Sequence, residues 1–194
     1  MKRRNAVARW VFVAVFAASG HALAQQSYNA PTVGVMGSEG RRWGFGADPG
    51  ATIGGFGFFG GWRLERWRVG LFEQNQWWVH GQGIATDFGG FVSLDLASLW
   101  LDPQLSAALF SRLEPALRFK WNESMWALAP SGVFGGRAAG IEIGFVATPQ
   151  YWLTEPPNNG NRWGLDLQVR LSCELIELVH FAQHVSAAND AMTP

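Results

Sequence analysis

The amino-acid sequence predicts an all-β protein: a closed antiparallel up-and-down transmembrane β-barrel of about eight strands. Three observations support this fold class. Apolar and polar residues alternate with a period of two along most of the chain, charges of both signs share the polar face, and Trp residues gather near the ends of the expected strands. A period of two is typical of strands whose two faces meet different surroundings. A chain of 194 residues suffices for one such domain.

Residues 1–24 have the pattern of a secretory signal peptide. The basic start Lys2–Arg4 precedes the apolar run Trp10–Ala18, and small residues ending in Ala22-Leu23-Ala24 follow it. The apolar run is shorter than the ~20 residues that cross a bilayer as a helix, which disfavours the alternative of a retained anchor. We therefore expect export through a cleaved signal peptide and a mature chain that begins near Gln25.

The composition excludes a disordered chain and argues against nucleic acid as a partner. Charged residues make up 15% of the chain and aromatic residues 14%, a balance that excludes a disordered chain. Four of the 15 basic residues lie in the first nine positions, which leaves 11 basic against 15 acidic residues, a net of −4, beyond residue 24. No basic cluster remains there, so nucleic acid is not an expected partner. The single Cys excludes an intramolecular disulfide.

The alternation is clearest in residues 163–175, where the odd positions are apolar and the even positions are polar or Gly. Interrupted only at Glu177, the odd series continues to Phe181. The other expected strands are 42–48, 52–64, 67–79, 84–100, 105–121, 125–134 and 140–150, and short turn-like stretches separate them, as in an antiparallel meander. The predicted organisation is thus an N-terminal segment 25–41, a barrel 42–181 and a C-terminal tail 182–194.

Two places fit the strand pattern less well. Residues 103–113 also fit a helix that Asp102 would cap, with Pro103 as its first residue. We favour a strand, because the period of two continues to Trp121 whereas a helix would have to stop before Pro115. Both Pro115 and Pro130 fit poorly in strands that have neighbours on both sides, so a bulge is one explanation there and a misplaced strand the other.

The charged residues indicate whether the polar face of the strands lines the barrel interior or faces the surrounding water. A soluble barrel keeps apolar side chains inside, whereas a membrane barrel has lipid outside and a polar interior. The polar face holds equal numbers of acids and bases, and nearly all of the bases are Arg, the residue that pairs best with buried carboxylates. We therefore predict a lumenal charge network of Arg63, Arg68, Asp87, Asp95, Arg112, Glu114, Arg118, Glu142, Asp166, Arg170 and Glu174.

The apolar face is unusually rich in Trp near the strand ends. Trp prefers the membrane–water interface, where its ring is buried while its N–H stays wet. Seven Trp side chains would also overfill the interior of a soluble eight-stranded barrel. We therefore predict an aromatic girdle made of Trp62, Trp67, Trp77, Trp100, Trp121, Trp126 and Trp163.

From Arg42 to Phe181 this pattern resembles the small outer-membrane β-barrel proteins of Gram-negative bacteria. The resemblance is one of pattern and involves no residue motif. It implies residence in the outer membrane, contact with outer-membrane lipid, and assembly by the barrel-assembly machinery, which reads an aromatic residue at the end of the last strand. Val179-His180-Phe181 looks like that ending, although residues 182–194 would extend beyond it.

The expected function is a structural or interaction role for a barrel with a packed, salt-bridged lumen. No catalytic residue, cofactor or metal site is predicted: His180 and His184 lack a third ligand, and Cys173 lies on the apolar face without a basic neighbour. The alternatives are a lipid-A-modifying outer-membrane enzyme and a soluble periplasmic calycin-like barrel that binds an apolar ligand. A lipid A deacylase would place His and Ser two residues apart on a late strand with an acid nearby, and no His on a predicted strand is followed by Ser at that spacing.

Export can be checked directly. N-terminal sequencing of the protein recovered from a Gram-negative host should begin within a few residues of Gln25, because small residues precede that position as they do at signal-peptide cleavage sites. An exported protein that still begins at Met1 would contradict the signal-peptide assignment.

Overall fold

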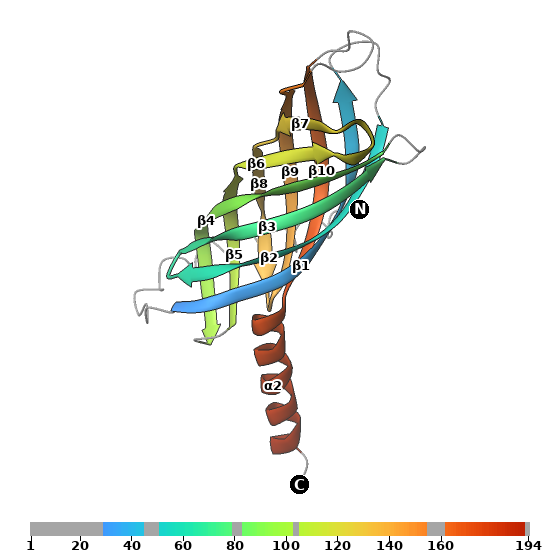
Figure 1. Cartoon of the computed structure of the whole chain (residues 1–194). Helices are drawn as coiled ribbons and strands as arrows, with labels where there is room; N and C mark the ends of the chain where they lie inside the picture. The colour runs from blue at the N-terminus through green and yellow to red at the C-terminus, as the bar shows by residue number, and fades with distance from the viewer. Residues whose placement is uncertain (1–28, 45–50, 79–82, 103–104, 155–161, 193–194) are drawn as a thin grey trace, which may run out of the picture.

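The computed structural model describes residues 29–44, 51–78, 83–102, 105–154 and 162–192, so the predicted signal peptide lies outside the described residues. They form one antiparallel sheet and a C-terminal helix (Figure 1). The elements are β1 (Asn29–Gly44), β2 (Ala51–Leu64), β3 (Trp67–Trp78), β4 (Ile84–Asp102), β5 (Leu105–Glu114), β6 (Ala116–Lys120), the 3-10 turn η1 (Trp121–Glu123), β7 (Met125–Leu128), β8 (Ser131–Ala138), β9 (Ile141–Trp152), β10 (Trp163–Glu174) and α2 (Leu175–Met192).

The sheet closes into a barrel of eight long strands, two of which are interrupted. β4 pairs with β5 along one half and with β6 along the other, so β5 and β6 together occupy one position in the barrel. β7 and β8 likewise share the next position, because both pair with β9. The interruptions fall at Pro115 and Pro130, since proline has no N–H to give to the ladder. The predicted eight-stranded barrel is confirmed, and residues from Leu105 onward are a strand rather than a helix.

The barrel begins earlier than predicted. β1 starts at Asn29, not near Arg42, and it closes the barrel by pairing with both β2 and β10. The alternation over 29–41 is hard to see because its outward face includes Glu39 and Arg41, while its inward face includes Met36 and several glycines.

The barrel also ends earlier than predicted. β10 stops at Glu174, and Val179-His180-Phe181 lies in helix α2, so it does not end the last strand. The neighbouring strand β9 begins at Ile141, which is opposite Cys173. Beyond Glu174 the chain therefore has no β9 backbone to pair with, and a helix satisfies its backbone hydrogen bonds within one segment.

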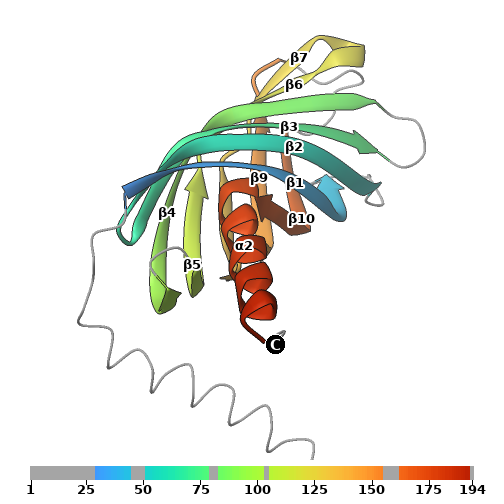
Figure 2. The ribbon, with the colours of Figure 1, turned by 90° about the horizontal axis from the view of Figure 1, so that it is seen from below.

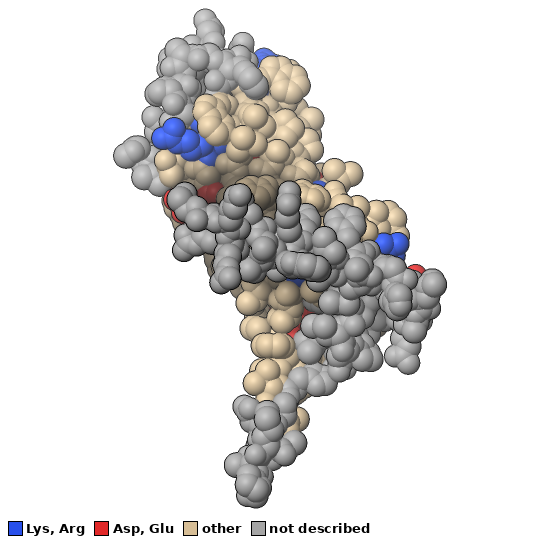
Figure 3. All heavy atoms as spheres, turned by 180° about the vertical axis from the view of Figure 1, so that it is seen from behind, with Lys and Arg blue, Asp and Glu red and all other residues tan. Residues whose placement is uncertain are grey.

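Side chains are arranged as in a membrane barrel and opposite to a soluble one. Arg112, Arg118 and Arg170 point into the lumen and are almost fully buried, whereas Leu71 is 72% exposed and Phe145 is 69% exposed on the outside. In the view from behind, the described outer surface carries few charged atoms (Figure 3). Apolar-out and polar-in alternation is the signature of a transmembrane β-barrel. None of the described helices has the length and hydropathy needed to cross a membrane.

The two ends of the barrel differ in their connections. At the end that carries β1's start and α2, a two-residue turn joins β2 to β3 and another joins β8 to β9. At the opposite end the connections between β1 and β2 and between β9 and β10 are longer. Helix α2 extends away from the barrel at the short-turn end (Figures 1 and 2).

The outward position of Phe145 on β9 can be tested by substitution. Phe145→Arg should lower the free energy of unfolding by about 2–4 kcal/mol because its cross-strand neighbours Phe134 and Val169 are apolar and Arg would face hydrocarbon, whereas Trp163→Arg at the strand end should cost about 0–1 kcal/mol. Urea unfolding in phospholipid vesicles measures both. Equal losses at the two positions would contradict the placement of Phe145 deep in the lipid.

Candidate functional site

The lumen contains equal numbers of basic and acidic side chains. Among the described residues, seven buried Arg and seven buried acidic side chains project into it. All eleven residues of the predicted network are among them, and the structure adds Arg42, Arg137 and Glu177. Fourteen buried charges of balanced sign are tolerable only if they pair, because an unpaired charge in a low-dielectric interior is very costly.

Near the end with the long connections, four charges form a chain of paired guanidinium and carboxylate groups. Arg42 donates from Nε and Nη2 to the two oxygens of Asp166, each at 2.7 Å. Arg118 donates to the same carboxylate at 2.6 Å and holds Asp87 through two bonds of 2.6 and 2.8 Å. Gln150 accepts a further bond from Arg118 at 2.7 Å. Arg suits this position because its planar fork matches a carboxylate at two points.

Toward the other end, Glu142 and Glu114 are the centres of a second cluster. Glu142 accepts hydrogen bonds from Arg68 and, at 2.6 Å, from Nη2 of Arg112. Arg170 donates to Glu114 at 2.5 Å, and Arg112 Nη1 lies 3.7 Å from the same carboxylate. These residues come from β3, β5, β9 and β10, so the ion pairs cross the lumen rather than link only adjacent strands.

A separate ion pair joins Arg137 of β8 to Asp95 of β4. Arg137 lies just before the turn between β8 and β9, where the sequence Gly135-Gly136-Arg137 looks like part of the turn itself. For this reason the alternation of apolar and polar residues did not identify Arg137 as lumenal.

Helix α2 contributes a charge to the lumen from outside the sheet. Glu177, in the first turn of α2, is 3% exposed, and its Oε2 lies 3.5 Å from Arg63 Nη2 and 3.7 Å from Arg68 Nη2. Glu174 at the end of β10 shares Arg68, at 2.9 Å. These ion pairs therefore fasten the start of α2 to the short-turn mouth of the barrel. Figure 2 shows the helix at this end of the barrel.

The lumen also contains an apolar layer that alternation alone did not predict. Met36, Phe59, Phe72 and Phe91 pack together on the inner faces of β1–β4. Two inward glycines make room for these rings, because a Cβ on Gly34 would collide with the Phe59 ring and one on Gly70 would collide with the Phe91 ring. These rings therefore lie in the lumen alongside the ion pairs.

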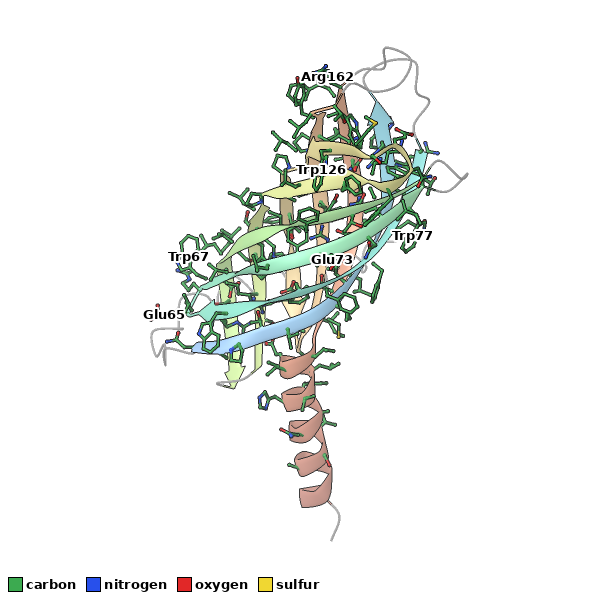
Figure 4. The ribbon with its side chains drawn as sticks, in the orientation of Figure 1. Glu65, Trp67, Glu73, Trp77, Trp126 and Arg162 are labelled. Atoms are coloured by element: carbon green, nitrogen blue, oxygen red, sulfur yellow. The ribbon has the colours of Figure 1, made fainter. Side chains whose placement is uncertain are left out.

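Six of the seven predicted girdle residues lie on the outside of the barrel. Trp62 and Trp67 flank the turn between β2 and β3, and Trp77, Trp121, Trp126 and Trp163 lie toward the opposite end, all with exposed side chains. Figure 4 shows Trp67, Trp77 and Trp126. The side chain of Trp100 lies outside the described residues. Trp43 at the end of β1 also faces outward, while Trp78 faces inward and stacks against Arg42 at 4.5 Å.

In the part of the chain that the structure describes, no group of three or more His, Cys, Asp or Glu residues could hold a metal ion. The carboxylates of the lumen are instead engaged by guanidinium groups.

Comparisons with known proteins give one structural likeness. The fold is similar to the crystal structure of Neisserial surface protein A, with a TM-score of 0.48 and 9% sequence identity over 76% of this chain and 99% of that protein. No family model and no curated protein matches the sequence. At this identity the likeness concerns the fold alone, so the function of this chain has to be inferred from its own side chains.

Arg118 is the most connected residue of the first cluster, which gives a direct test of the network. Arg118→Leu should leave the buried carboxylate of Asp87 without its guanidinium partner and Asp166 with Arg42 alone, and so lower the free energy of unfolding by roughly 3–5 kcal/mol. Lys120→Gln is the control, because the partly exposed Lys120–Glu123 pair should contribute about 0–1 kcal/mol. Urea unfolding and heat-modifiable gel mobility report both, and an Arg118→Leu protein as stable as wild type would contradict the paired lumen.

Proposed function

We propose that this protein is a non-conducting outer-membrane barrel with a structural or interaction role. The observation that supports this proposal is the lumen, where balanced ion pairs and an apolar layer occupy the interior. Eight strands leave an interior just wide enough for side chains, so a lumen filled in this way has no room for a water-filled channel.

The same lumen argues against carriage of an apolar ligand inside a soluble barrel. Such a ligand requires an apolar interior, whereas this one holds fourteen charged side chains. The outward face would in turn expose large apolar residues to water over the full height of the barrel, and exposed patches of that size belong to membrane or partner contacts.

The lengths of the connections between strands indicate how the barrel is oriented in the outer membrane. Bacterial outer-membrane barrels have short periplasmic turns and longer extracellular loops. By that rule, the end with the two-residue turns faces the periplasm. Helix α2 then extends into the periplasm, and the longer connections face outward from the cell.

In this arrangement the barrel is a membrane anchor that presents α2 on the periplasmic side. The first turn of α2 is fixed to the barrel through Glu177, so the helix leaves the membrane at a defined point. The interaction role therefore belongs to α2, the long connections or the outer wall, and the lumen provides stability.

Location and conductance test the proposal. The protein should fractionate with outer membranes and need detergent for extraction, and purified protein in a planar lipid bilayer should give no steady single-channel current, because the ion pairs fill the lumen. A pore-forming porin in the same bilayer is the positive control. Folded protein in the detergent-free periplasmic fraction would reject the membrane assignment, and steady current steps would reject the non-conducting lumen.

A further inference from the structure

The lipid-facing wall of the barrel is not uniform. Among the described residues, β5 through β10 carry no charged or amide side chain on their outward faces between the girdles. The outward charged and amide side chains lie instead on β1 and β3, where they are Glu39, Arg41, Glu73 and Asn75, and the hydroxyl residues Thr52 and Thr86 lie beside them on β2 and β4. Charged residues at membrane depth are costly and are found where they meet a partner group.

Glu39 and Arg41 on β1 are the two oppositely charged residues that lie closest together in this polar sector. Both are exposed on the outer face of β1, two residues apart, and neither forms an ion pair with another described residue. A groove of about 490 Å³ lies beside them and is lined by Thr52 on β2 and by Leu167 and Val169 on β10. An acid, a base and an adjoining groove thus lie together on a surface that elsewhere presents hydrocarbon.

The sector extends across β3 to β4 through a chain of hydrogen bonds. Glu73 lies on β3 between the two girdle residues Trp67 and Trp77 (Figure 4). Asn75 donates to Glu73 at 3.3 Å, and Thr86 donates to Asn75 at 2.7 Å. Trp121 completes the chain by donating to Thr86 at 2.8 Å. A carboxylate between the girdles is too deep for a lipid headgroup to reach, which favours a protein partner over a bound lipid.

We infer that this polar sector of β1–β4 is the interface at which a second copy of the chain binds in the membrane, with Glu39 and Arg41 at the contact. A two-fold interface is isologous, so the same patch must be complementary to itself. Glu39 and Arg41 meet that condition, because Glu39 of one copy can pair with Arg41 of the partner subunit and the reverse pair forms by symmetry. This inference rests on the membrane location proposed above.

Cysteine cross-linking in native membranes tests the contact. In a Cys173→Ser background, Gly37→Cys places a thiol on β1 beside Glu39, where a Cβ meets only a backbone oxygen at 3.9 Å. Gly132→Cys on β8 is the matched control, since nothing lies within 4 Å of a Cβ there and β8 is far from β1 around the barrel. Oxidation should shift Gly37→Cys to a band of twice the monomer mass and leave Gly132→Cys monomeric.

Charge reversal tests the pairing itself. In the Gly37→Cys protein, Arg41→Glu or Glu39→Arg alone should abolish the dimer band, because like charges would then face each other across the two-fold axis. The double variant Glu39→Arg with Arg41→Glu should restore it. Heat-modifiable mobility identifies variants that still fold, and only those are compared.

The outcomes separate this inference from the proposed function. Protein that is absent from the membrane fraction rejects the proposed location. Folded, membrane-embedded protein whose Gly37→Cys variant cross-links no more than Gly132→Cys, or cross-links to a different protein, overturns the interface between copies. Failure of the double variant to recover the dimer overturns the pairing of Glu39 with Arg41.

Discussion

Pairing of buried charge is the constraint on which the rest of this structure depends. A barrel of eight strands must fill its own interior, and this chain fills much of it with guanidinium and carboxylate groups. Each group is tolerable only in the presence of its partner, so strand order, register and closure must all be correct at once. Arg118 shows this coupling, because it joins Asp87 on β4 to Asp166 on β10 across the lumen.

The paired charges of the lumen also affect the short-turn end of the barrel and its outer wall. The start of α2 becomes part of the barrel, because Glu177 supplies the carboxylate that Arg63 and Arg68 meet at the short-turn mouth. The described lumenal carboxylates are engaged by guanidinium groups, so the surfaces that we expect to serve recognition lie outside the lumen. The outer wall is one of them, with its polar side chains confined to the β1–β4 side.

The candidate site was partly predictable from sequence. The eleven lumenal charges were found because they alternate with apolar residues on regular strands, so a period of two assigns their face. The period of two did not reveal Arg137, because the two glycines before it look like a turn. It did not reveal Arg42 either, because the outward face of β1 includes the charged residues Glu39 and Arg41. Glu177 lies in a helix, where a period of two assigns no face. The pairs themselves were not predictable, because a partner across the lumen depends on register around the closed barrel.

The sequence by itself determined the fold class, the number of long strands and the separation of a charged inside from an apolar outside, because each of these depends on a local period of two. Only the tertiary structure decided where the barrel begins and ends. β1 begins at Asn29 because β2 pairs with it from there, and β10 adds a second edge from Gly34 onward. Residues after Glu174 are helical because β9 offers them no edge. Strand boundaries depend on neighbours that are distant in the sequence, and local periodicity carries no information about them.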